Sequence, residues 1–117
     1  MQPTDAPPTV PELIDLWESA LETVAGLGDA ATDEQWRLPT PCPGWSVGDV
    51  VAHLIDIEQV MAGSPRPEHE PDWSGLPHAQ GDFGRLTEIG VDHRRAKQRE
   101  EVVAELRETI ALRRSQL

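Results

Sequence analysis

His53 is the residue of this sequence best placed to do chemistry, because two carboxylates lie about one helical turn away from it. Asp49 comes four residues earlier and Asp56 three residues later, so in a helix both would lie close to the imidazole. A neighbouring carboxylate can orient a histidine that binds a metal ion. The same spacing also fits a half-buried histidine that simply pairs with Asp49, and spacing alone favours this second interpretation.

No further metal ligand is paired with His53 by spacing, since the sequence has neither a His-Glu-x-x-His nor a Cys-x-x-Cys pattern. Catalytic zinc needs three protein ligands and an open position. His69 and His78 fall in a stretch rich in proline and glycine, and we expect them to be solvated loop residues. His93 is expected on the surface near the start of a helix.

The turn that precedes His53 holds other candidates. Cys42 lies near the start of a helix, where a thiol can be acidic and reactive, but it has no adjacent basic residue, so a buried apolar role is favoured. Trp36 and Trp45 flank the turn and are expected to wedge it between the first two long helices. Ser46 is expected to cap a helix rather than to act as a nucleophile.

Cap signals and prolines delimit the helices that must position these residues. Thr9 and Glu12 predict a capping box at the start of a first helix, which Gly26 and Gly28 are expected to end. A short helical start over residues 32–37 is cut off by three alternating prolines, which hold residues 39–43 extended. Ser46 then begins the second long helix.

Apolar residues at helical spacing predict the buried faces of three long helices. The predicted buried residues are Leu13, Trp17, Ala20, Leu21 and Val24 in the first helix, Val47, Val50, Val51, Leu54, Ile57 and Met61 in the second, and Val103, Leu106, Ile110 and Leu117 in the third. The third helix is expected from near Asp92 to the last residue, after a long loop at about residues 63–90.

Three long helices without strand signals predict an all-α protein. We expect a disordered lead over residues 1–8 and, over residues 9–117, an up-down helical bundle that is incomplete. A four-helix bundle packs each apolar stripe against two neighbours. The chain is therefore either three-helical, or its fourth helix is missing from this sequence or supplied by another chain.

The composition limits the partners and the setting of this single domain. The 117 residues include 21 Asp or Glu against 10 Lys or Arg, which argues against nucleic acid and against an anionic membrane surface. The single cysteine excludes an internal disulfide. Without a signal peptide or an apolar run of about 20 residues, the sequence favours a reducing cytoplasm.

One long block of the sequence resembles a known family. The block is residues 36–54, WRLPTPCPGWSVGDVVAHL. It is similar to the signature of the mycothiol-dependent maleylpyruvate isomerase metal-binding domain, within the DinB-like four-helix-bundle superfamily. The runs 90–95, 104–108 and 113–114 look like the third helix of that family, and the resemblance extends over roughly residues 9–117.

The resemblance implies that His53 is the first ligand of a divalent metal, usually zinc. The other family ligands, a glutamate and a histidine on a fourth helix, have no counterpart in these residues. In a complete family member, the metal would activate a small thiol such as mycothiol, and the thiolate would add to an electrophilic substrate in isomerase or S-transferase chemistry.

A competing interpretation is a non-catalytic helical interaction module. It would use His53 only structurally and would pair its exposed apolar face with a partner helix or with a second copy as a homodimer.

Overall fold

The computed structural model describes residues 6–117, and these form helices without a named strand. The all-α prediction is confirmed. The helices are α1 (Val10–Ala30), α2 (Asp33–Trp36), α3 (Val47–Met61), the 3-10 helix η1 (Trp73–Gly75), α4 (Gly81–Arg95) and α5 (Arg99–Gln116). The predicted disordered lead falls mostly on residues 1–5, which lie outside the described residues.

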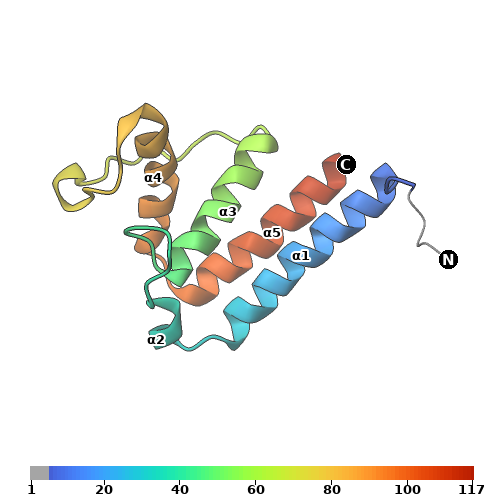
Figure 1. The fold of residues 1–117 in the computed structure, drawn as a ribbon, viewed down its shortest axis with the longest axis horizontal. Helices are drawn as coiled ribbons and strands as arrows, with labels where there is room; N and C mark the ends of the chain where they lie inside the picture. The colour runs from blue at the N-terminus through green and yellow to red at the C-terminus, as the bar shows by residue number, and fades with distance from the viewer. Residues whose placement is uncertain (1–5) are drawn as a thin grey trace.

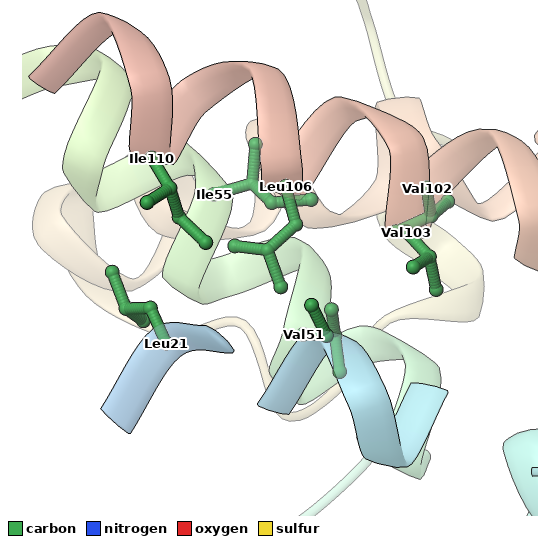
Figure 2. Packing of buried hydrophobic residues seen from close by; sticks show 8 residues of the cluster. Leu21, Val51, Ile55, Val102, Val103, Leu106 and Ile110 are labelled. Atoms are coloured by element: carbon green, nitrogen blue, oxygen red, sulfur yellow. The ribbon is translucent and has the colours of Figure 1, made fainter. Parts of the chain in front are cut away.

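The fold is organised around α5, which runs between α1 and α3, while α4 packs against α3 (Figure 1). α1 runs antiparallel to α5, as the ion pairs of Arg107 with Asp29 and of Arg114 with Asp15 require. Side chains of α1, α3 and α5 form the apolar core (Figure 2). Its buried members are Leu21, Ala25, Val51, Ile55, Val102, Val103, Leu106 and Ile110. Each large member stabilises the fold by about 1.5–3 kcal/mol through burial.

The helix starts lie where the sequence predicts them. Thr9, Thr32 and Ser46 each accept a hydrogen bond from the backbone N–H three residues later, and the side chain three residues later accepts one in return. These reciprocal bonds satisfy backbone donors that no helix can satisfy internally.

The predicted end of the first helix was wrong, because α1 continues through both glycines to Ala30. Gly28 packs against Val103 of α5 and Trp36 of α2, and a Cβ atom there would collide with Val103. This glycine serves close helix packing rather than helix termination.

The prediction of one third helix from Asp92 onwards was also wrong. The helix is interrupted at residues 96–98, which connect α4 to α5. Gln98 and Glu101 form a capping box at the start of α5. The described residues thus hold four long helices, not three, and the loop ends at residue 80 rather than 90. Hydrophobic periodicity missed α4 because it buries Glu88 and Arg94 beside a single buried valine, Val91.

The predicted buried face of the second long helix was largely wrong. Of its six residues only Val51 is buried, while Ile57 and Met61 are exposed. The opposite face of α3 is buried instead: it holds Gly48, Asp49, Val51, Ala52, Ile55, Asp56 and Glu58.

In α1, Leu21 is buried as predicted but Leu13 and Ala20 are exposed. In α5, the predicted Val103, Leu106 and Ile110 are buried, whereas Leu117 is exposed. None of the helices in the described residues is long and apolar enough to cross a membrane.

Candidate functional site

His53 lines a hollow of about 470 Å³ between α3, α4, the proline-rich turn and the loop that precedes α4. The walls are mainly apolar. Polar groups reach the hollow from Asp56, Arg66, His78 and Glu88. A hollow of this size, with few convergent polar groups, is typical of small-molecule sites.

The imidazole of His53 is partly buried and lies against Trp45, with the ring centroids 4.9 Å apart. Its Nδ1 atom is buried and has no hydrogen-bond partner among the described residues. Burial lowers the pKa of His53 below its usual value, and the opposing effect of Asp56 is smaller. The ring is therefore neutral at pH 7 and keeps a nitrogen lone pair.

The pairing of His53 with Asp49, which spacing favoured, does not occur. The carboxylate of Asp49 accepts a hydrogen bond from the backbone N–H of Ser46 at 3.0 Å. Its other oxygen lies 3.2 Å from Nε of Arg95. Asp49 is thus occupied in capping α3 and in holding α4, which leaves His53 without that partner.

The turn over residues 39–46 presents Trp45 to the hollow. Thr40 donates hydrogen bonds from its backbone N–H and its hydroxyl to the carbonyl of Trp45. Gly44 has a φ of +78°, a conformation that favours glycine, and a Cβ atom there would collide with the ring of His78. The absence of a side chain at Gly44 therefore lets this turn pack directly against the loop that carries His78.

The turn also corrects two of the expectations made from sequence. Cys42 is exposed at the hollow rather than buried. Trp36 packs against α1 and α3 as expected, since it touches Gly28 and Gly48. Trp45 instead faces His53 and α4.

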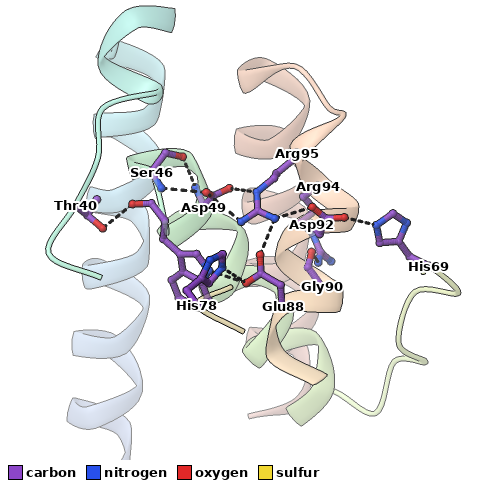
Figure 3. Close-up of polar contacts among 11 residues, drawn as sticks. Thr40, Ser46, Asp49, His69, His78, Glu88, Gly90, Asp92, Arg94 and Arg95 are labelled. Atoms are coloured by element: carbon purple, nitrogen blue, oxygen red, sulfur yellow. Dashed lines mark hydrogen bonds and ion pairs between the residues drawn. The ribbon is translucent and has the colours of Figure 1, made fainter. Parts of the chain in front are cut away.

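Glu88 joins the elements around the hollow (Figure 3). Its side chain is 1% exposed. One carboxylate oxygen accepts a hydrogen bond from Nε1 of Trp45 at 2.8 Å and lies 3.1 Å from Nε2 of His78. The other lies 2.6 Å from Nη1 of Arg95. His78, expected to be solvated, is thus largely buried in this network.

Arg95 continues the network to the far side of α4 (Figure 3). Nη1 of Arg95 lies 2.6 Å from Asp92, which in turn lies 2.7 Å from Nε2 of His69. Burial lowers the pKa of Arg95, but Asp92, Asp49 and Glu88 outweigh it and raise the pKa overall. His69 is therefore paired rather than solvated.

The prediction for His93 was wrong in its position. The residue lies in the last turn of α4, not near a helix start, and its ring centroid is 5.6 Å from that of His69. Neither His69 nor His93 lines the hollow beside His53.

The described side chains do not complete a zinc site around His53. Within residues 6–117, no group of three or more His, Cys, Asp or Glu side chains could hold a metal ion. Asp56 is engaged by Arg66 at 3.3 Å and Arg94 at 3.5 Å, and Glu88 is engaged as described above. His53 offers one free nitrogen, which is fewer than the three protein donors of a catalytic zinc.

A second hollow, of about 410 Å³, lies at the corner between α4 and α5. It is lined by several basic residues, including Arg94, Lys97 and Arg99. Arg94 and Lys97 both bind Glu105, and Arg99 binds Asp33. Their charges are matched within the fold, so this hollow is a weaker candidate than the one beside His53.

Sequence reasoning found His53 but missed Glu88 and Arg95. Both lie in α4, part of which was assigned to a loop. The only signal in the sequence was the spacing of Glu88 and Arg95. They are seven residues apart, which places them about two turns apart on the same side of a helix.

A family model of the mycothiol maleylpyruvate isomerase N-terminal domain matches residues 17–117. No curated protein matches the chain, and no solved structure does.

Proposed function

The chain belongs to the family of mycothiol maleylpyruvate isomerase N-terminal domains, and from this premise we propose that the hollow beside His53 binds a small thiol such as mycothiol. The proposal includes a divalent metal, zinc among the biological ions, with His53 as one of its ligands. The activity that fits the family is thiol-dependent isomerase or S-transferase chemistry on an electrophilic substrate. We further propose the DinB-like bundle as the fold type, with four long helices in the described residues.

One observation carries this proposal: His53 is a neutral histidine with an unpartnered buried nitrogen on the wall of an apolar hollow. Buried polar atoms are rarely left without a partner, and an exception calls for a ligand, a water or a catalytic role. A neutral imidazole can accept a thiol proton or coordinate a metal.

The other side chains of the hollow would position the ligand. Trp45 offers an aromatic face beside His53, while Ile57 and Met61 supply apolar walls. Arg66, whose side chain is 37% exposed, carries a guanidinium at the rim that suits an anionic substituent.

A bound divalent metal would lower the pKa of a thiol. The donors around His53 do not fit a complete zinc site, so the proposal routes no chemical step through the metal. It limits the role of this chain to supplying His53 and the walls of the hollow.

Metal uptake tests the proposal. Purified protein is dialysed against Zn²⁺ or Co²⁺, and bound metal is measured by elemental analysis for wild type, His53→Ala and His93→Ala. Because His53 offers a single free donor nitrogen, we expect weak metal uptake by wild type and by His93→Ala, and none by His53→Ala. His93→Ala is the matched control because His93 lies outside the hollow.

Thiol binding is tested separately by titrating mycothiol and following tryptophan fluorescence. Trp45 lies against His53, so we expect a saturable change that is lost in Trp45→Phe. Equal, negligible metal in all three proteins together with no mycothiol response would refute the proposal. A cytoplasmic setting, which we also propose, would keep the exposed Cys42 reduced.

A further inference from the structure

The loop that connects α3 to α4 forms one wall of the hollow beside His53. We name residues 64–80 the lid loop. Three of its side chains line the hollow, those of Arg66, His78 and Ala79. The other walls belong to α3, to α4 and to the proline-rich turn. A movement of the lid loop would therefore change the access to His53 while the helices stay in place.

The backbone of the lid loop contributes little to its attachment. Within the part of the chain that the structure describes, the backbone hydrogen bonds of positions 65–78 all lie inside the loop. Every residue of the lid loop is described, and only Pro71 and Ala79 are buried. Segments that bury few apolar groups open locally at a low cost in free energy.

Three contacts between side chains hold the lid loop against the helices instead. Each joins a basic side chain of the loop to a carboxylate of α3 or α4. The pairs are Arg66 with Asp56 at 3.3 Å, His69 with Asp92 at 2.7 Å and His78 with Glu88 at 3.1 Å. Figure 3 shows the two histidine pairs, whose carboxylates both contact Arg95. We name these three pairs the latches.

A glycine with a positive φ lies directly outside each end of the lid loop. The φ angle is +84° at Gly63 and +72° at Gly81, a conformation that favours glycine. A Cβ atom at either position would meet no atom within 4 Å, so no packed neighbour fixes the backbone there. Hinges of moving loops are a few residues at the ends of elements that absorb changes in φ and ψ.

We propose that residues 64–80 are a lid that turns about Gly63 and Gly81 and admits a small molecule to His53. The latches are closed in the structure. Opening breaks them and withdraws Arg66 and His78 from the hollow, while closing returns both side chains and excludes water from the imidazole. The role in ligand entry rests on the proposed function, whereas the opening itself does not.

One latch can be released without a change in the hollow. His69 and Asp92 form a latch, but neither of them lines the hollow. The indole N–H of Trp45 reports the opening, because it donates to the same oxygen of Glu88 that His78 approaches. When His78 leaves with the lid, water reaches this N–H.

Hydrogen exchange measured by NMR tests the opening in wild type, His69→Ala and Glu68→Ala. Glu68 is exposed on the same loop and belongs to none of the latches, so Glu68→Ala is the matched control. We expect the indole N–H of Trp45 to exchange about two- to fivefold faster in His69→Ala, the range over which a partly exposed ion pair shifts an equilibrium. Glu68→Ala should match wild type, and amides of α5 should be unchanged in both variants.

Two outcomes of the exchange experiment overturn the proposal. One is an equal exchange rate at Trp45 in the two variants, because the latch would then not hold the lid. The other is an acceleration in His69→Ala that extends equally to α5, because the variant would then be destabilised as a whole.

Stopped-flow mixing with mycothiol, followed by tryptophan fluorescence, tests whether the lid controls entry. We expect association to be faster in His69→Ala by a similar factor and unchanged in Glu68→Ala. An association rate that His69→Ala leaves unchanged, despite faster exchange at Trp45, overturns the control of entry. If mycothiol binds to none of the three proteins, the proposed function fails, and the exchange comparison decides the lid by itself.

Discussion

Glu88 is the residue of the candidate site whose side chain connects the turn, the loop and α4. Its buried carboxylate binds Trp45 from the turn, His78 from the loop and Arg95 from its own helix. A buried carboxylate is stable only when its charge is matched. The residue therefore ties the turn and the loop to α4.

Replacing Glu88 by Gln is expected to lower the free energy of unfolding by about 1–3 kcal/mol, because the half-buried guanidinium of Arg95 loses one of its three carboxylate partners. Urea unfolding followed by circular dichroism measures the change. Glu100→Gln is the control, since Glu100 has a side chain that is 69% exposed, and surface ion pairs contribute about 0–1 kcal/mol. Equal losses in the two variants would contradict the central role of Glu88.

His53 is expected to titrate below the unperturbed histidine value of about 6.5, because burial disfavours its charged form. The unfolded state therefore binds more protons than the folded state in this pH range. The stability that His53 contributes is present above the unfolded pKa and is lost as the pH falls through the folded pKa. NMR titration of the imidazole gives the pKa directly.

The variant His53→Gln isolates this effect. Between neutral pH and the lowered pKa, its unfolding free energy should fall less steeply with decreasing pH than that of wild type. His93, whose pKa burial also lowers, is present in both proteins and cancels from the comparison. A histidine titrating above its ordinary value would exclude the neutral imidazole on which the proposed function rests.

At the scale of elements, close approach between helices depends on glycine. A Cβ atom at Gly90 of α4 would collide with the carboxyl group of Asp56 in α3. Asp56 in turn pairs with Arg66 and Arg94. The close approach of α3 and α4 thus depends on glycine at position 90.

Gly90→Ala is expected to destabilise the protein by about 1–3 kcal/mol, the usual cost of overpacking. Gly26→Ala is the matched control in a helix, because a Cβ atom there would meet nothing within 4 Å. That control should be stabilised by up to about 1 kcal/mol through helix propensity. Thermal unfolding of both variants checks the opposite signs, and a stabilised Gly90→Ala would contradict the packing.

The corner between α4 and α5 is held by Arg94 and Glu105. Nε and Nη2 of Arg94 donate to the two carboxylate oxygens of Glu105 at 2.9 and 3.0 Å. Burial raises the pKa of Glu105, but Arg94, Gln59 and Lys97 outweigh it and lower the pKa from 4.5 to about 2. The ionised form is thus strongly favoured in the folded state.

The contribution of Glu105 to stability is expected to be complete above pH 4.5 and to be lost as the pH falls through about 2. Glu105→Gln should remove this contribution, so that its stability falls less than that of wild type between those two pH values. Guanidinium unfolding at several pH values measures the difference. Parallel pH profiles for the two proteins would rule out the assigned role.

At the scale of the whole molecule, α4 differs from the other long helices in how it is attached. α1, α3 and α5 share the apolar core. Within the part of the chain that the structure describes, α4 buries only one apolar residue, Val91, beside the polar Glu88 and Arg94. Its attachment therefore depends on ion pairs more than on apolar burial.

Native-state hydrogen exchange is expected to reflect this division. Amides of α5 over residues 102–110 should exchange most slowly, those of α4 faster, and those of the loop over residues 64–72 fastest. Acid should accelerate exchange in α4 before α5, because protonation removes its carboxylate partners. Equal protection of α4 and α5 at low pH would contradict a polar attachment.

The sequence alone determined the features that depend on neighbours along the chain. The capping boxes at Thr9, Thr32 and Ser46 join groups three residues apart, and the prolines before Gly44 exclude a helix regardless of tertiary context. These local rules place His53 on a helix directly behind the turn. The family resemblance, carried by that same segment, is confirmed by the match over residues 17–117.

Only the tertiary structure decided which side of α3 is buried and which residues surround His53. The spacing of apolar residues predicted that Val47, Val50, Leu54, Ile57 and Met61 face the core, but none of them is buried. Periodicity along one helix carries no information about arginine side chains that distant helices supply. Asp49 meets Arg95 across 46 positions and Trp45 meets Glu88 across 43. Matched charges made burial of the acidic side favourable, and no local pattern encodes a partner so far away in the chain.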